Sequence, residues 1–335
     1  MLRRKRFWFG LIISLSFLGI FLARTDFSEI WEALSGADYA LALAAVPLYF
    51  VGFWVRTLRW RFLLRPVNDV PTLRLYPVVL IGLMANNVAP ARVGEFVRAY
   101  LLGERESMSK STALGTIAVD RAFDGLTLVA MLGVVAAFAG STPGIKTIGI
   151  VTALAFFAAT MVLASLAMSA RARVLLARAI TLLPGGLAVK VEAIMEAFMN
   201  GLVAIRNPVA LASAALASFG SWMIEATMYY IIGLAFDLQV GFHVYILIVA
   251  AANLALSLLA SPGGVGPFEL ATKQVLVSFA VDAPVAAAYA LALHALLLAP
   301  VILVGLALLW STQFSLSQIL GVPKEARAGG TVGAK

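Results

Sequence analysis

The feature that most constrains this chain is its number of apolar stretches long enough to cross a lipid bilayer. A spanning helix needs roughly 20 predominantly apolar residues. The bilayer core offers no water to backbone groups, so such stretches cross it as helices. Stretches of this length lie at about 7–23, 39–63, 112–139, 147–168, 208–236 and 286–310. The sequence therefore predicts an all-α polytopic membrane protein with about six full spans.

Composition supports a membrane protein and excludes several kinds of site. Hydrophobic residues make up 62% of the chain and charged residues only 13%, which leaves too little polar surface to cover a soluble domain. The absence of cysteine excludes disulfides, thiolate metal sites and cysteine nucleophiles. The only two histidines, His243 and His294, are far apart in sequence. We therefore expect no metal site and no cofactor.

Two further apolar stretches, about 75–102 and 243–281, are each interrupted by a cluster of proline and glycine. We interpret each as a re-entrant hairpin, because both residue types break helices and the freed backbone groups must be buried in protein. Two short spans in place of each hairpin is an alternative that the charge pattern leaves open. Between the two halves, residues 187–205 place apolar side chains at helical spacing with charges elsewhere around the turn. This pattern is typical of an amphipathic interfacial helix.

The expected organisation is one transmembrane domain over 1–310, with halves 1–168 and 207–310 joined by an interfacial linker helix within 171–206. A disordered cytoplasmic tail is expected at 311–335. Most of the 25 Lys and Arg residues then lie on one side, which the positive-inside rule places in the cytoplasm. The net charge of +8 therefore reflects topology rather than nucleic-acid binding. We expect a multi-pass protein of the bacterial cytoplasmic membrane with both termini cytoplasmic.

The two interrupted stretches are similar around their breaks. Each has a small residue, then Pro90 or Pro262, then two residues and Val-Gly, in which the glycines are Gly94 and Gly266. Asn87 belongs to an Asn-bearing apolar run before the first break. Paired breaks in two halves are typical of transporters whose binding site lies near the bilayer midplane. We therefore predict an inverted repeat, with ordinary loops between short spans as the alternative.

Charged residues within or beside apolar segments are the candidates for function, since a charge at the bilayer centre costs at least ~2.5–3.5 kcal/mol. Two short series of charged residues stand out. One lies beside the first break and consists of Arg92, Glu95 and Arg98; the other lies in the third span and consists of Asp120, Arg121 and Asp124. We expect these charges to pair with one another or to line a binding groove. Arg92 and Arg98 beside a helix start would suit a phosphate group.

Three more charged or titratable positions lie in the second half. Glu269 and Lys273 are spaced i,i+4 after the second break, so they either pair with each other or contribute to the site at the break. Glu225 and His294 have no partner nearby in sequence, so each must reach another helix or water. We expect Glu225 and His294 to be the candidates for proton coupling.

Three segments together resemble the flippase-like membrane family that includes the transmembrane region of lysylphosphatidylglycerol synthases. They read GLMANNVAPARVGE at 82–95, STALGTIAVDRAFD at 111–124 and SPGGVGPFE at 261–269. The resemblance extends over most of 7–310 and implies a lipid translocase. Family members are associated with aminoacylated phospholipids, and related ones with polyprenyl-linked or hopanoid lipids.

The resemblance also implies an expectation about enzymatic activity. The synthases carry a further C-terminal soluble domain that transfers lysine from tRNA. This chain ends about 25 residues after its last predicted span, so we expect that domain to be absent. On this ground the protein is expected not to be an enzyme.

The leading hypothesis is a flippase-like transporter that moves a polar-headed lipid, either anionic, aminoacylated or an isoprenoid phosphate, between leaflets. Its expected partners are a membrane lipid and a lipid-synthesising enzyme. The residues expected to line or gate the path are Asn87, Pro90, Arg92, Gly94, Glu95, Arg98, Asp120, Arg121, Asp124, Pro262, Gly263, Gly264, Gly266 and Glu269. Two alternatives stay open: an intramembrane enzyme in which Asp120 and Asp124 bind a divalent cation, and a scaffold for a lipid-synthesis partner.

Overall fold

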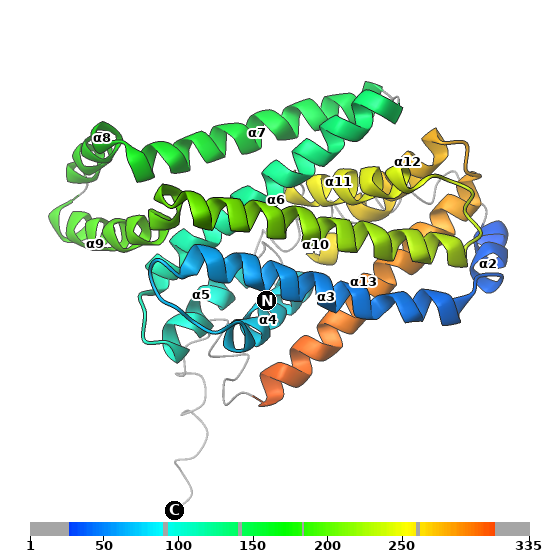
Figure 1. Cartoon of the computed structure of the whole chain (residues 1–335), viewed down its shortest axis with the longest axis horizontal. Coiled ribbons are helices and arrows are strands. Elements are labelled where there is room, and N and C mark those ends of the chain that lie inside the picture. The colour runs from blue at the N-terminus through cyan, green and yellow to red at the C-terminus, as the bar shows by residue number, and fades with distance from the viewer. Residues whose placement is uncertain (1–26, 90–92, 140–142, 183, 259–261, 312–335) are drawn as a thin grey trace, which may run out of the picture.

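The computed structural model describes residues 27–89, 93–139, 143–182, 184–258 and 262–311. Within these ranges the regular secondary structure is all helix, without a strand, as the sequence predicted. The predicted first span at 7–23 and the predicted tail beyond Ser311 lie outside the described residues. Figure 1 shows long helices that lie side by side along the molecule, with shorter helices at both ends.

Five long helices coincide with predicted apolar stretches. They are α3 (Tyr39–Leu64), α6 (Lys110–Ala139), α7 (Pro143–Met168), α10 (Pro208–Ala235) and α13 (Ala283–Ser311). Among the described residues, α3, α10 and α13 are long and apolar enough to cross a membrane. The second half of α7 and α8 (Ala170–Thr181) would make a fourth span if this pair, bent by 95°, is counted as one. The structure thus provides three or four candidate spans, and the number six stays a prediction.

Local sequence explains where two of these helices begin. The Asp38 side chain accepts a hydrogen bond from the backbone N–H of Leu41 at 3.1 Å and so caps α3. Asn207 caps α10 in the same way, accepting from Val209 and Ala210 at 3.1 Å each. Pro208 follows at the first helical position, where its missing N–H costs nothing.

Both interrupted stretches fold as pairs of helices that pack against each other. The first pair is α4 (Thr72–Val88) and α5 (Gly94–Arg105); the second is α11 (Phe242–Leu258) and α12 (Pro267–Ser278), joined through the short 3-10 helix η2 (Pro262–Gly264). In the first pair, Gly94 lies against Gly82 and Asn86, and the stem of Arg98 lies over Gly82. Residues close to the break therefore meet across it, which means that the chain reverses and forms a hairpin.

The two halves meet along a seam between α3 and α10, which run antiparallel. Along this seam Gly52 lies beside Ser221, Arg59 donates to Ser218, and Phe62 lines a pocket with Ser213. The halves also share a contact pattern. The first hairpin packs α4 on α13 and α5 on α6, and the second packs α11 on α6 and α12 on α13. The main apolar core lies in the second half and includes buried residues of α10, α11, α12 and α13.

The segment predicted as one linker helix folds as α8, α9 (Gly185–Gly201) and the 3-10 helix η1 (Leu202–Arg206). Pro184 lies between α8 and α9, at the N-cap of α9. Proline has no backbone N–H to donate, so it interrupts a helix. Val189 and Ile194 on α9 are exposed, as are Leu175 and Leu182 in and after α8. Figure 1 shows α8 and α9 at one end of the molecule, beyond the long helices, whereas α2 (Phe27–Ser35) lies at the other end.

A glycine contact holds the end of α9 against α6. Gly201 lies against the backbone of Thr112 and Gly115, and Gly115 lies against the backbone of Phe198. A methyl group at either glycine would overlap the backbone of the other helix, which cannot move as a flexible side chain can. Glycine at these positions is therefore a packing requirement of the crossing.

We expect Gly201→Ala to lower the apparent melting temperature of the detergent-purified protein, because overpacking costs about 1–3 kcal/mol. The matched control is Gly220→Ala within α10, where an added methyl group meets nothing within 4 Å. Alanine is favoured over glycine inside a helix by about 1 kcal/mol, so the control should melt at the same or a higher temperature. Equal melting of both variants would contradict the tight crossing.

Candidate functional site

A fully buried arginine on α3 forms the centre of the candidate site. Arg59 is 0% exposed and donates from Nε to Asp120 Oδ1 at 2.8 Å and from Nη1 to Asp124 Oδ1 at 2.5 Å. Nη1 also lies 3.0 Å from Ser218 Oγ on α10. Removing an unpaired charge from water costs several kcal/mol, so this arginine requires both carboxylates. The ion pairs tie α3 to α6 at the seam between the halves.

Two further arginines complete the network. Arg98 on α5 donates to Asp120 Oδ2 at 3.1 Å and stacks over Trp60, with its guanidinium carbon 4.1 Å from the ring centroid. Arg121 lies 2.8 Å from Asp124 Oδ2 and 4.0 Å from Glu95 Oε1. The network thus contains three arginines and three carboxylates and is electrically balanced as a group.

The balanced network nevertheless keeps polar atoms without a partner in the described part of the chain. They are Arg59 Nη2, Arg98 Nε, Arg121 Nε and Glu95 Oε2, all inaccessible to solvent. Arg121 and Glu95 are also its most exposed members, with side chains 34% and 18% exposed. The network therefore has one partly open side and spare arginine donors in its interior, which together can accept an anionic group.

A second ion pair lies further along the same seam. Arg56 on α3 contacts Glu225 Oε2 on α10 at 2.5 Å, and its guanidinium carbon lies 3.9 Å from the centroid of Trp222. Glu225 Oε1 accepts from Tyr229 at 3.1 Å and from Asn253 at 3.4 Å. The sequence-based expectation that Glu225 must reach another helix is confirmed.

A third pair lies beside the second break. His294 Nδ1 on α13 is 2.7 Å from Glu269 Oε1 on α12, and both side chains are about 5% exposed. Glu269 therefore pairs with His294; the sequence had left open both a local pair with Lys273 and a role at the break. The cause is that α12 packs against α13, so a partner across the interface competes with one along the helix. The expectation that His294 must reach another helix is confirmed.

Glycine conformations shape the second break. Gly263, Gly264 and Gly266 have φ values of 61°, 76° and 95°, which side chains with a Cβ rarely adopt. The backbone oxygen of Asn87, at the end of α4, lies beside Gly263, so the first hairpin contacts the second break here. Pro262 begins η2. The predicted site residues Pro90 and Arg92 lie outside the described residues.

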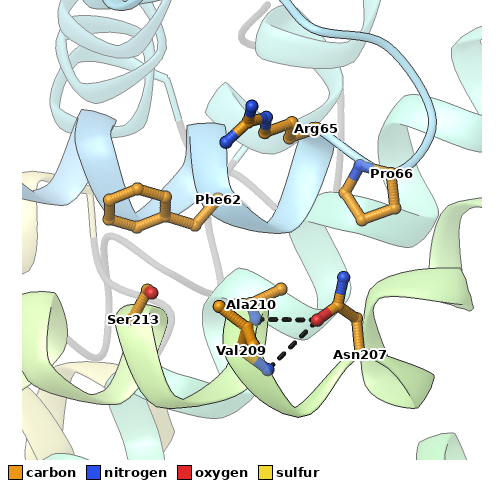
Figure 2. A pocket seen from close by; sticks show the side chains of 7 residues that line it. All are labelled: Phe62, Arg65, Pro66, Asn207, Val209, Ala210 and Ser213. Carbon is orange, nitrogen blue, oxygen red and sulfur yellow. Dashed lines mark hydrogen bonds between the residues drawn. The ribbon is translucent and has the colours of Figure 1, made fainter.

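A pocket opens on the α3–α10 seam one helical turn beyond Arg59. It is lined by Phe62, Arg65 and Pro66 at the end of α3 and by Asn207, Val209, Ala210 and Ser213 at the start of α10. Figure 2 shows these two groups on opposite sides, with the Arg65 guanidinium directed away from the α10 residues. The volume of the pocket is about 270 Å³. The Arg65 side chain is 68% exposed and lies 3.8 Å from Asp69. The pocket is thus separate from the buried network but shares the same two helices.

Sequence analysis identified every member of the network except Arg59, and it also missed Arg56 of the second ion pair. Both were counted with the basic residues that mark the cytoplasmic side, although they lie inside the apolar stretch 39–63. The signal that could have identified them is their position inside a predicted span, at i,i+3 spacing. A charge within the membrane needs a buried partner. Asp120 and Asp124 are neutralised by arginines, which removes the free carboxylate oxygens that a divalent cation would need. Among the described residues no His, Asp or Glu group has metal-binding geometry.

Comparison with known proteins places the chain in a membrane protein family. The model of the lysylphosphatidylglycerol synthase TM region family matches residues 7–305. The chain belongs to this family. A UPF0104 membrane protein of Methanothermobacter thermautotrophicus is 26% identical over 86% of this chain and 87% of its own length. UPF0104 membrane protein MJ1078 of Methanocaldococcus jannaschii is 25% identical over 57% of this chain. No solved structure matches the chain.

A third relative corrects one expectation. Glycosyltransferase AglD of Haloferax volcanii is 29% identical over 97% of this chain, which spans 57% of the length of that relative. We expected the protein not to be an enzyme. A relative that matches nearly the whole chain and is named a glycosyltransferase contradicts this expectation, so membership of the family does not exclude enzymatic activity.

We expect Arg59→Met to lower the free energy of unfolding by about 3–5 kcal/mol, because it leaves the buried carboxylates with one cation too few. The double variant Arg59→Met, Asp124→Asn restores the charge balance and should recover part of this loss. Thermal unfolding of the purified proteins measures both effects. The control is Arg65→Ala, which removes an exposed arginine six residues further along the chain and should have little effect. A double variant no more stable than Arg59→Met would contradict charge balance as the cause.

Proposed function

We propose that this protein moves a lipid with an anionic head group from one membrane leaflet to the other. The observation that carries the proposal is the buried network, in which Arg59, Arg98 and Arg121 each keep an N–H donor without a partner. Guanidinium groups match the oxygens of a phosphate in geometry and charge. These donor atoms are inaccessible to solvent, so a phosphate would reach them only after side chains of the network have moved. The substrate class is thus a phospholipid or an isoprenoid phosphate.

The pocket in Figure 2 supports a path along the α3–α10 seam. Phe62 follows Arg59 by one helical turn, or about 5 Å of rise, so the pocket lies next to the network along the helix. Arg65 at the pocket would attract an anionic head group from the membrane surface. In this mechanism the head group moves along the polar seam while the acyl chains stay in the surrounding lipid.

We further propose that the two halves form an inverted repeat of six spans and two re-entrant hairpins. In such a repeat the symmetry axis lies in the membrane plane, so equivalent helices run antiparallel. The antiparallel crossing of α3 and α10 supports this arrangement, as does the matching pattern of hairpin contacts in the two halves. The distribution of basic residues supports a cytoplasmic membrane location with both termini inside and the segment of α8 and α9 at the interface.

The test is lipid translocation in liposomes that contain the purified protein and a fluorescent phosphatidylglycerol analogue. We expect Arg98→Ala to slow translocation about ten- to hundredfold, because a hydrogen bond to a charged group is worth about 1.5–3 kcal/mol. Glu95→Ala should slow it as well, since the network then carries a net positive charge that retains an anionic head group.

The matched control is Glu104→Ala, which removes an exposed carboxylate of the same helix that pairs with Lys110 at 2.7 Å. It should translocate lipid like the wild type. Size-exclusion chromatography identifies any variant that fails to fold. Normal translocation by both the Arg98 and Glu95 variants would contradict the proposed site.

The name of the Haloferax relative favours a second function, sugar transfer to a lipid carrier. The proposed site is compatible with it, because a polyprenyl phosphate acceptor carries the same anionic group. Purified protein would be incubated with a nucleotide sugar and a polyprenyl phosphate, and the lipid fraction analysed for a glycosylated product. A lipid-linked sugar formed by wild type and not by Arg98→Ala supports this function. Lipid movement without any such product supports the transporter.

A further inference from the structure

Both ring nitrogens of His294 face hydrogen-bond acceptors. Nε2 lies 3.0 Å from the backbone oxygen of Gly263, and Nδ1 lies 2.7 Å from Glu269 Oε1. The other carboxylate oxygen of Glu269 accepts the backbone N–H of Gly266 at 2.7 Å. The side chains of His294 and Glu269 thus attach two residues of the second break, 262–266, to α12 and α13.

Counting hydrogens shows that this arrangement contains an additional proton. A carbonyl oxygen can only accept, so Nε2 must carry a hydrogen. A neutral imidazole has a single N–H, which would leave the Nδ1 lone pair facing a carboxylate oxygen. The short Nδ1–Oε1 contact therefore needs a second hydrogen, either on the imidazole or on the carboxyl group. Compared with a neutral histidine and an ionised glutamate, the pair holds one more proton.

We propose that Glu269 and His294 form a proton-binding site that latches the second break to α13. With the proton bound, every contact of the pair is a hydrogen bond. Without it, two lone pairs face each other inside the protein, and an unsatisfied buried acceptor costs about 1–3 kcal/mol. The single N–H of the neutral imidazole then stays on Nδ1, where it faces the ionised Glu269, so the carbonyl of Gly263 loses its donor and the break is released. The glycine conformations of the break allow its backbone to rearrange once these contacts are lost.

The first hairpin has a corresponding pair that cannot respond to protons in this way. Arg121 on α6 lies 4.0 Å from Glu95 on α5, and a guanidinium group stays charged at any physiological pH. Asn86, which does not titrate, accepts the N–H of Gly94 at 2.7 Å. Each hairpin is thus attached through an acid on its second helix and a basic residue on the following helix. Only the second hairpin uses a histidine.

In the transporter proposed above, this latch makes the proton the coupling ion, a conclusion that rests on the proposed function. The backbone of Asn87 contacts Gly263, so release of the second break alters the end of the first hairpin. Binding or release of the proton therefore affects both hairpins, which open alternately in the proposed transporter. Glu225, the other predicted coupling residue, is held as an ion pair by Arg56, which leaves His294 for this role.

The pair is surrounded by an aromatic ring, backbone and the titratable groups of the neighbouring helices. Phe268 stacks on the imidazole, with ring centroids 4.3 Å apart, and shields it from solvent. α11 contributes Leu256 beside Gly264, and α4 contributes backbone. The elements packed around the pair carry further titratable or charged groups. Among described residues these include Lys273 on α12, Tyr289 on α13, His243 and Tyr245 on α11, Arg74 and Tyr76 on α4, Tyr229 and Glu225 on α10, Arg56 on α3, and Glu29, Glu32 and Asp282 near the start of α13.

The test measures access to the break directly and does not depend on transport. Because the chain contains no cysteine, Val265→Cys introduces a single label site within the break. The rate of maleimide labelling is measured from about pH 6 to about pH 9, a range that includes the unperturbed histidine titration. It is divided by the rate at Leu182→Cys, which is 85% exposed, so that the ionisation of the thiol itself cancels.

With the wild-type pair the rate ratio should be low at acidic pH and rise with pH by at most about tenfold per unit, the limit for one proton. Glu269→Gln should keep the ratio low at every pH, since the amide can donate to Nδ1 and accept from Gly266 without titrating. His294→Ala should keep it high at every pH. The control His243→Ala, which changes the only other histidine, should follow the wild type.

A wild-type ratio that does not change with pH would overturn the latch, and so would a Glu269→Gln variant that still follows pH. The outcome is independent of the proposed function. A pH-dependent ratio in a protein that moves no lipid would support the latch and contradict the transporter. Lipid transport combined with a pH-independent ratio would do the reverse.

Discussion

A charge that is buried in a low-dielectric interior needs a partner of opposite charge. The rest of the structure depends on how this requirement is met at Arg59. Its two carboxylate partners lie on α6, its hydroxyl partner lies on α10, and Arg98 from α5 shares Asp120. Breaking one such pair costs several kcal/mol, which fixes the relative positions of these helices. The α3–α10 seam is therefore polar in its middle, although both helices are apolar enough to cross a membrane.

The same constraint explains the difference between the two hairpins. Each break frees backbone groups that need partners, and each obtains one from a side chain: Asn86 for Gly94 and Glu269 for Gly266. The basic residue that completes the arrangement is an arginine in the first half and a histidine in the second. In the proposed latch a proton therefore has the part in the second half that the permanent charge of an arginine has in the first.

Much of this arrangement could be predicted from the sequence. Hydrophobic length located five long helices, and the Pro/Gly clusters located both hairpins, because helix breaking is a local property. The partners of the buried charges could not be predicted in this way. Arg56 and Arg59 pair with residues more than 60 positions away, and Glu269 pairs with His294 across a helix interface. Such choices depend on packing between helices, which local spacing does not encode. The number of spans also depends on the thickness of the membrane, and the hydropathy of a sequence does not give that thickness.

The most direct test of the account is mass spectrometry of the lipids retained by the protein after gentle purification. Wild type would be compared with an Arg98→Ala, Glu95→Ala double variant, which removes one positive and one negative charge and so keeps the network balanced. The account predicts that one anionic head-group class is enriched on the wild type and lost from the variant. A lipid profile that matches the bulk membrane for both proteins would contradict an anionic head-group site at the buried arginines.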